Sequence, residues 1–262
     1  MTRSTTKLAE GHVALVTGAG SGIGRATAHL FAEEGARVVC VDLLEASGEE
    51  TAAAIRDLGR EAVFVRADVT DEDSVRAMVT SAIDRYGRLD SAFNNAGISD
   101  SKSRLHELTY ESWQKMIAVN LSGVFLCMKY EIAQMLEQEP VGRRRGAIVN
   151  TSSGAGFIAA PGMPHYTAAK HGVLGMVKNA AQDYYTDGIR VNAICPGLTD
   201  TPMVADSLEG DSDFARRIRA SLPGGEAGRP EDVAQAAVWL CSERARWING
   251  EPMLVDGGSV SR

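Results

Sequence analysis

The chain has 262 residues, of which 44% are hydrophobic and 23% charged, and its formal net charge is −7 at pH 7. These values are typical of a globular protein with a large core, in one big α/β domain or two small ones. The negative charge argues against a non-specific nucleic-acid surface, because such surfaces concentrate lysine and arginine. We interpret the tight basic run Arg143-Arg144-Arg145 as a solvated loop.

The cysteines and the first residues indicate a reducing compartment. The four cysteines are widely spaced and form no CxxC, which predicts neither a disulfide framework nor a metal site. Cys40, Cys127 and Cys195 lie in apolar runs, so we expect buried thiols. The polar lead Met1 to Glu10 lacks the apolar core of a signal peptide, and no apolar run approaches about 18 residues. We therefore expect a cytoplasmic protein with no membrane segment.

The first half of the chain alternates between β-like apolar runs and amphipathic helical patterns. Thr70 is the expected N-cap of the third helix. The strands are predicted at about 12–17, 37–42, 62–67 and 89–94, and the helices at about 22–34, 45–58 and 71–86. Short connections with right-handed crossovers make such strands parallel.

The second half continues the alternation until one long insertion. Strands are predicted at about 146–151, 189–194 and 253–255, and helices at about 110–137, 165–186 and 230–242. The helix at 165–186 is rich in small residues, which allow close packing on the sheet or on another subunit: Ala168, Ala169, Gly172 and Gly175. Between 198 and 228 the alternation fails, and a long insertion of this kind favours substrate contacts. Its apolar residues suggest a lid, to which Phe157 would add: Met203, Leu208, Phe214 and Ile218.

This order of elements predicts a single domain, residues 1–262, with a polar lead at 1–10 and a substrate loop at 198–228. The expected fold is α/β: one Rossmann-like, doubly wound parallel sheet of six to seven strands with helices on both faces. In such sheets, ligands bind beyond the carboxyl ends of the strands. Asp42, Asn94, Ser153 and Pro196 are all predicted to lie at that edge.

The first strand breaks into glycines and leads directly into a helix. The glycines follow the spacing Thr-Gly-x-x-x-Gly-x-Gly from Thr17 to Gly24 and would let the backbone approach a pyrophosphate closely. The helix that follows presents free N–H groups and the positive end of its dipole. The pattern alone also fits an ordinary strand-to-helix turn.

Asp42 ends the second strand, 18 residues after Gly24. That spacing is close to the one at which a carboxylate binds the adenosine ribose of NAD. The same charge would repel a 2′-phosphate, and the next residues, Leu43 and Leu44, offer no cation to neutralise one. We therefore favour NAD over NADP. The alternative is that Asp42 merely caps the next helix.

Tyr166 and Lys170 are four residues apart in a helical stretch and share one face. Tyrosine is a poor base at neutral pH, and a neighbouring ammonium favours its phenolate. The pair therefore suits proton transfer, although surface pairs with this spacing are common.

Taken together, these motifs resemble the short-chain dehydrogenase/reductase family from about Gly11 to Ser259. The resemblance rests on the segments Thr17–Gly24, Asp68-Val69, Asn94–Gly97, Asn120, Ser153, Tyr166–Lys170, Pro196-Gly197 and Val255–Gly258.

The resemblance implies a role for each matching catalytic residue. Tyr166 would be the general acid/base, Ser153 would hold the substrate oxygen, and Lys170 would lower the pKa of the tyrosine and contact the nicotinamide ribose. Asn120 would support a water that links Lys170 to solvent. Ser152 is the competing serine, but the family places its serine about 13 positions before the tyrosine, which fits Ser153.

The resemblance also implies a cofactor site. Asp68 and Val69 would bind adenine, and the segment from Pro196 to Thr201 would hold the carboxamide. Thr199 stands where the family often has Ile or Val, but its backbone would make the contact. The residues implied to bind the cofactor are Gly18, Ser21, Gly22, Ile23, Gly24, Asp42, Asp68, Val69, Asn95, Gly97, Tyr166, Lys170, Pro196, Gly197, Thr199 and Thr201. His165 is adjacent to Tyr166 on the helix and so points about 100° away, which favours a pocket-rim or exposed position.

The resulting hypothesis is an NAD-dependent oxidoreductase that moves a hydride between nicotinamide and a secondary alcohol or ketone. An NADPH-dependent ketone or 3-oxoacyl reductase is the alternative within the same class, and a non-catalytic NAD-binding sensor is the alternative from another class. The substrate would be a small alcohol or ketone, with polyols, cyclic diols, steroids and terpenoid alcohols all open. The resemblance further implies a homotetramer built on the long helix and the small-residue helix.

Overall fold

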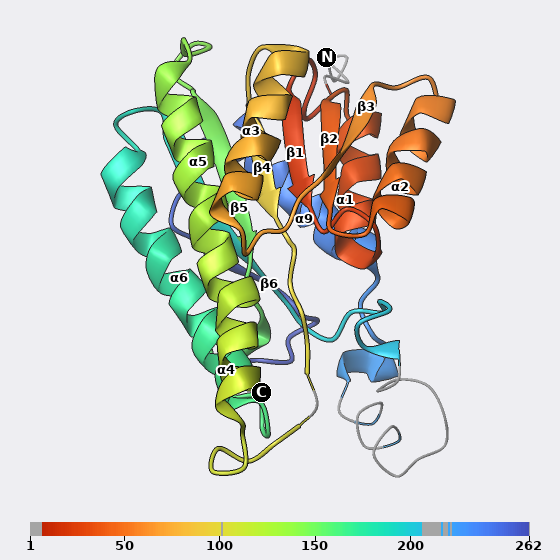
Figure 1. Cartoon of the computed structure of the whole chain (residues 1–262), viewed down its shortest axis with the longest axis vertical. Coiled ribbons are helices and arrows are strands. Elements are labelled where there is room, and N and C mark those ends of the chain that lie inside the picture. The colour runs from red at the N-terminus through yellow and green to blue at the C-terminus, as the bar shows by residue number, and fades with distance from the viewer. Residues whose placement is uncertain (1–6, 101, 206–215, 217–219, 221, 262) are drawn as a thin grey trace.

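The computed structural model describes residues 7–100, 102–205, 216, 220 and 222–261, and its centre is a seven-stranded sheet in which every neighbouring pair is parallel. The strand order is β3-β2-β1-β4-β5-β6-β7. The strands are β1 (Val13–Thr17), β2 (Arg37–Asp42), β3 (Ala62–Arg66), β4 (Ser91–Asn94), β5 (Gly146–Thr151), β6 (Ile189–Pro196) and β7 (Pro252–Val255). The order reverses between β1 and β4, so the predicted doubly wound sheet is confirmed (Figure 1).

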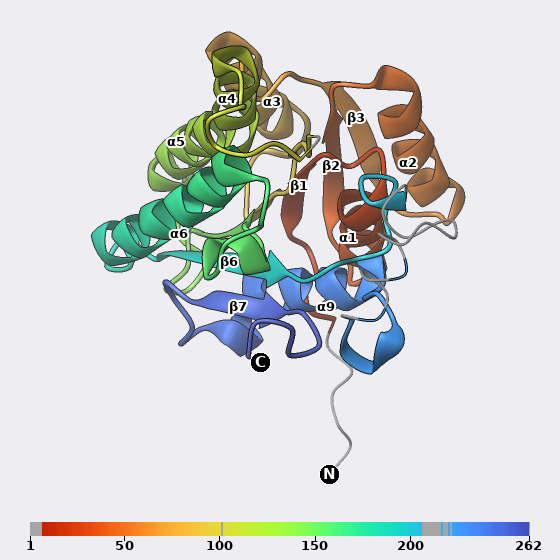
Figure 2. The same ribbon diagram turned by 90° about the horizontal axis from the view of Figure 1, so that it is seen from below.

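Helices cover both faces of the sheet and enclose two apolar cores. One core forms under α1 (Gly22–Glu33), α2 (Glu45–Asp57) and α9 (Pro230–Cys241). The other forms under α3 (Glu72–Tyr86), α5 (Gly123–Glu137) and α6 (Pro164–Tyr184). Figure 2 shows the two groups of helices on opposite sides of the strands. The central strands are apolar throughout because both of their faces are covered, as in β1, where all five residues are buried.

The predicted long helix has a local change of winding that the sequence pattern does not show. It consists of α4 (Tyr110–Ile117), a π-helical turn η1 (Ala118–Ser122) and α5. Asn120 lies in the π turn and is fully buried. Such turns occur frequently at functional sites, because the extra residue redirects side chains and backbone carbonyls.

This helix, residues 110–137, is the one described helix that is long and apolar enough, by length and composition alone, to cross a membrane. Its inner residues, among them Val124, Cys127 and Met135, are part of the core beside α3 and α6. A core helix passes the same test of length and hydropathy.

Two local predictions were wrong. Asp71, not Thr70, is the N-cap of α3 and accepts a hydrogen bond from the Ser74 backbone at 2.7 Å, while Thr70 donates to Asp68. The basic run is not a solvated loop throughout. Arg144 has a side chain that is only 12% exposed and forms an ion pair with Glu243 at 3.1 Å.

Other predictions are confirmed. The three cysteines expected in the core are buried, and Cys241 is buried as well. The small residues of α6 allow close packing, since a Cβ on Gly172 would lie 2.8 Å from Leu121, whereas one on Gly175 would meet open space. Short 3₁₀ turns at 154–156, 223–225 and 243–245 complete the described elements. Leu208, Phe214 and Ile218 of the predicted lid lie outside the described residues.

Candidate active site

The glycine loop lies at the carboxyl end of β1 and packs too tightly for larger residues. A Cβ on Gly24 would run into the carbonyl oxygen of Gly18. Gly18 and Gly22 have φ of +66° and +49°, a region that glycine enters at no steric cost. Gly22 also faces Thr201, whose Cγ2 would lie 3.0 Å from an added Cβ. The glycine loop, residues 18–24, thus forms a narrow cradle, with Thr201 packed against its Gly22.

The first turn of α1 leaves its backbone donors available at this cradle. Ser21 is the N-cap in extended conformation and makes no side-chain cap bond, and the first turn holds no acidic residue. Ser21 is exposed, while Gly22 and Ile23 are half-buried. Unpaired N–H groups and the positive end of a helix dipole suit a phosphate group.

Asp42 is held rigidly at the end of β2. Its Oδ2 accepts from the Gly20 backbone at 2.8 Å, and its Oδ1 accepts from the Leu44 backbone at 2.9 Å. Leu44 itself is the N-cap of α2. Asp42 thus ties the glycine loop to the start of α2, which goes beyond the simple capping alternative.

Two arginines near Asp42 were missed in the sequence. Arg66 pairs with Asp42 in the β2–β3 register and is exposed. Arg25 donates to the carbonyl of Gly20 at 2.6 Å and forms an ion pair with Glu50 at 2.7 Å. The strand pairing sets Arg66 beside Asp42 in register, and Arg25 bonds the same Gly20 whose N–H donates to Asp42.

The residues expected around the adenine and the nicotinamide also gather at this edge. Asn95 donates its backbone N–H to the Thr17 hydroxyl at 3.0 Å, a contact that the sequence did not suggest. Asp68 is half-buried, and the buried Val69 packs on α5, where a Cβ on Gly123 would lie 2.9 Å from it.

The segment that follows β6 forms the opposite wall of the edge. Pro196 ends β6, and Gly197 lies so close to Asp256 that an added Cβ would be 2.9 Å from its Cα. Thr199 is buried and pairs with Gly228 in a single β-bridge, and the Thr201 hydroxyl donates to the Thr199 carbonyl at 3.3 Å. Gly197 thus lets this segment lie close to Asp256, whereas Gly228 has room for a Cβ.

Asn120 holds the loop after β4. Its Oδ1 accepts from the Ile98 backbone N–H and its Nδ2 donates to the Ile98 carbonyl, both at 2.9 Å. A Cβ on Gly97 would lie 3.0 Å from the same Oδ1. The side-chain amide of Asn120 thus exchanges both of these bonds with one residue, Ile98.

Ser153, Tyr166 and Lys170 come together between β5 and α6. Lys170 is buried, donates to the Thr151 carbonyl at 2.9 Å and places its Nζ 5.5 Å from the centre of the Tyr166 ring. The Ser153 hydroxyl accepts from the Ala155 backbone at 3.1 Å. Ser152 instead points into the protein and donates to the Lys170 carbonyl at 2.9 Å. The spacing argument for Ser153 over Ser152 therefore agrees with the orientation of both serines.

Burial acts on the protons of this group. It raises the pKa of Tyr166, and a hydrogen bond with Ser153 opposes the rise only in part. It lowers the pKa of Lys170 to about 8. Lys170 therefore remains an ammonium group at neutral pH, but it does not offset the effect of burial on Tyr166 in this structure.

The expectation for His165 was wrong. Its side chain is fully buried, not exposed or at a rim, and its Nε2 lies 3.7 Å from Oδ2 of Asp100. The 100° rotation away from Tyr166 directs the ring toward the loop after β4, which covers it.

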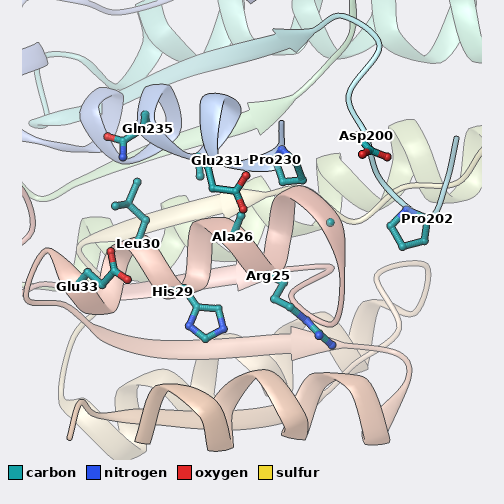
Figure 3. A pocket seen from close by; sticks show the side chains of 12 residues that line it. Arg25, Ala26, His29, Leu30, Glu33, Asp200, Pro202, Pro230, Glu231 and Gln235 are labelled. Atoms are coloured by element: carbon teal, nitrogen blue, oxygen red, sulfur yellow. The ribbon is translucent and has the colours of Figure 1, made fainter. Parts of the chain in front are cut away.

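A groove of about 500 Å³ lies between α1 and α9 (Figure 3). Its lining mixes charged and polar side chains, with Arg25 and His29 from α1 and Glu231 and Gln235 from α9. The groove touches the site through Gly22 and Asp200 but includes none of the catalytic candidates. The catalytic candidates lie instead at the carboxyl edge of the sheet, where Lys170 donates to the last residue of β5, Thr151.

Comparisons with known proteins place the chain among oxidoreductases. The family model described as "Enoyl-(Acyl carrier protein) reductase" matches residues 18–260. The chain is 44% identical to the cis-4-hydroxycyclohexanecarboxylate dehydrogenase of Sinomonas cyclohexanicum, over 94% of this chain and 95% of the relative. It is 40% identical to the 2,5-dichloro-2,5-cyclohexadiene-1,4-diol dehydrogenase of Sphingobium indicum strain UT26, over 95% and 96%. The crystal structure of levodione reductase superposes with a TM-score of 0.91 at 36% identity, covering 96% of this chain and 98% of the other.

A parallel sheet that carries a glycine cradle and a Ser-Tyr-Lys group defines a nicotinamide-dependent oxidoreductase. The chain belongs to the short-chain dehydrogenase/reductase family. It acts on CH–OH groups, by hydride transfer between a secondary alcohol or ketone and the nicotinamide cofactor.

Proposed function

We propose that the protein is an NAD-dependent dehydrogenase of alicyclic secondary alcohols. The observation that carries the choice of NAD is the carboxylate of Asp42, fixed by the Gly20 and Leu44 N–H groups at the end of β2. A fixed carboxylate accepts hydrogen bonds from ribose hydroxyls and repels a 2′-phosphate. Two relatives whose names specify ring alcohols support the substrate class.

The residues present fit a dinucleotide. The glycine cradle and the open first turn of α1 would hold the pyrophosphate, and Asp42 would hold the adenosine ribose. Asp68, Val69, Asn95 and Gly97 would line the adenine side and the middle of the cofactor, and the segment from Pro196 to Thr201 would hold the carboxamide. When bound, the nicotinamide supplies the carbon that accepts or gives the hydride.

The residues between β5 and α6 would handle the proton. Tyr166 would take the proton of the substrate hydroxyl at its phenolic oxygen during oxidation and return it during reduction. Ser153 would donate a hydrogen bond to the substrate oxygen, where negative charge develops. The ammonium of Lys170, anchored on the Thr151 carbonyl, would favour the phenolate of Tyr166.

Tyr166→Phe tests the function. Removing the phenolic oxygen removes the acid/base group, so kcat should fall by about a hundredfold or more. The measurement is the absorbance of reduced cofactor during oxidation of a panel of ring alcohols with NAD. Tyr185→Phe, just beyond the end of the same helix, is the control and should retain wild-type activity. A Tyr166→Phe enzyme with more than about a tenth of the wild-type kcat would refute the role.

Asp42→Asn tests the cofactor. The amide keeps the shape but loses the charge, so kcat/KM with NADP should rise relative to NAD by about tenfold. The exposed Arg66, which lies next to Asp42 in register, is the observation that favours the alternative, an NADPH-dependent ketone or 3-oxoacyl reductase. A wild-type preference for NADPH would establish that alternative, and NAD binding without turnover of any alcohol would favour the sensor.

We further propose a homotetramer built on α5 and α6 and a cytoplasmic location. The exposed ring of Phe125 and the open space over Gly175 support the first proposal. The second is supported by four free thiols, which suit a reducing compartment.

A further inference from the structure

His165 is the second residue of α6, directly before Tyr166, and its side chain is fully buried. Both ring nitrogens are shielded and have no hydrogen-bond partner among the described residues. An imidazole carries at least one N–H donor, and a buried donor without a partner destabilises the fold, which an apolar side chain in the same place would not. A polar group close to the ring could remove this penalty.

The carboxylate of Asp100 lies close to this ring, in the segment that connects β4 to α4. Its Oδ2 lies 3.7 Å from Nε2 of His165. This distance is too long for a hydrogen bond, but a shift of less than about 1 Å would close one. The carboxylate also accepts from the hydroxyl of Ser112 in the first turn of α4. Asp100 is thus held from one side by α4 and faces His165 on the other.

The chain is anchored on both sides of Asp100. Before it, Ile98 exchanges two hydrogen bonds with the side chain of Asn120. After it, the Ser103 N–H donates to the Gly162 carbonyl at 2.8 Å, just before α6 begins. Asp100 lies between these two anchors, so a bond to His165 would fix the middle of the segment.

We propose that His165 is a positioning residue, which donates from Nε2 to Asp100 and so holds residues 97–100 against the start of α6 in the reacting complex. This inference rests on the proposed function, since it concerns the complex in which Tyr166 acts. The bond joins the loop that carries Gly97, on the cofactor side, to the helix that carries Tyr166. Residues His165 and Asp100 act through these neighbours and do not touch the reacting atoms.

The kinetic test uses single and double variants. His165→Leu and Asp100→Ala should each lower kcat/KM for the best ring alcohol by about tenfold, mainly through kcat. The double variant should lose no more than either single one, because both remove the same bond. His165→Gln retains an N–H donor and should recover most of the activity.

Controls separate this bond from its surroundings. His171→Leu changes an exposed histidine on the same helix and should leave kcat/KM unchanged. Ser112→Ala removes the other contact of Asp100 and should cost less activity than Asp100→Ala. A His165→Leu enzyme within about twofold of wild type, or additive losses in the double variant, would overturn the proposal.

Hydrogen exchange gives a readout that needs no turnover. On addition of NAD, the backbone amides of Ile98 and Ser103 should exchange more slowly in the wild type but not in His165→Leu. If the wild type oxidises no alcohol, the proposed function fails, and the exchange comparison still decides the role of His165. Equal protection in both proteins would contradict it.

Discussion

At the scale of single residues, burial moves the pKa values of Tyr166 and Lys170 in opposite directions. The phenol of Tyr166 holds its proton more tightly than an ordinary tyrosine, and the pKa of Lys170 falls to about 8. Alcohol oxidation needs Tyr166 without its proton, whereas ketone reduction needs it with one. A positive Lys170 is therefore most useful to the oxidation reaction, in which the phenolate must form.

The need for the Tyr166 phenolate in oxidation makes the rate of oxidation depend on pH. For oxidation, kcat/KM should rise between about pH 6 and about pH 9, because the small phenolate fraction of Tyr166 grows with pH below its raised pKa. Reduction uses the protonated phenol, which persists over this range, so its dependence on Tyr166 should be much flatter. Lys170→Met should lower the oxidation rate at neutral pH by about tenfold or more and shift the rise to higher pH, because the phenolate loses its neighbouring charge. Lys178→Met, exposed on the same helix, should leave the profile unchanged. Profiles of kcat/KM in both directions provide the measurement, and a flat profile for oxidation would contradict the assignment.

Glu131 is a second residue whose proton is held by burial. Its side chain is fully buried in α5, and Oε2 accepts from the Asn94 amide at 2.8 Å. The same Asn94 nitrogen donates to Asn150 at 3.0 Å, and Oε1 of Glu131 has no partner among the described residues. Desolvation raises the pKa of Glu131 from 4.5 to about 7, against the opposing effect of the Asn94 bond.

Stability should therefore fall as the pH rises. The folded protein keeps the Glu131 proton up to about pH 7, while the unfolded chain releases it near its ordinary value of 4.5. The contribution of this proton is fully present below the lower value and is lost through the higher one, which amounts to a few kcal/mol. Glu131→Gln mimics the protonated acid, so it should be more stable than the wild type above neutral pH and should flatten the dependence. Chemical unfolding across pH measures this, with Glu137→Gln on the exposed face as control. An unchanged pH dependence in Glu131→Gln would refute the prediction.

At the scale of elements, periodicity predicted the order of strands and helices because each strand is buried on both faces. Apolar runs with glycine ends therefore marked β1, β2 and the others clearly. The π turn around Asn120 left no such trace, since Ala118 to Ser122 read as ordinary helix. The contact made from this turn is tertiary, since the side chain of Asn120 bonds the backbone of Ile98, which is distant in sequence.

The site shows the same division. The glycine spacing and the Tyr166 and Lys170 pair could be predicted because they are local patterns, and the structure brings them to one edge. His165 was assigned to the wrong environment because its cover comes from the loop after β4. Arg144 was misjudged for a similar reason, since Glu243 pairs with it from far along the chain. The sequence pattern did not predict the burial of these two residues, because their partners come from other elements.

At the scale of the whole molecule, the helices α5 and α6 each have a buried inner face and an exposed outer face. Their inner sides complete the core under the sheet, whereas Phe125 on α5 has half of its side chain exposed and Gly175 on α6 borders open space. An aromatic ring and a glycine on neighbouring outer faces offer apolar contact and close backbone approach to a second copy. This combination is the basis of the proposed tetramer.

Substitution on these faces tests the assembly. Phe125→Asp would bury a charge in the interface and Gly175→Leu would fill the space that a neighbouring helix needs, so either should convert the tetramer to smaller species. Leu58→Asp, at an exposed apolar residue after α2, is the matched control and should leave the assembly intact. Sedimentation velocity measures the mass directly. Because the proposed catalytic group is contained in one chain, smaller species that stay folded should keep cofactor binding. A wild-type protein that sediments as a monomer would refute the tetramer without affecting the assignment of the site.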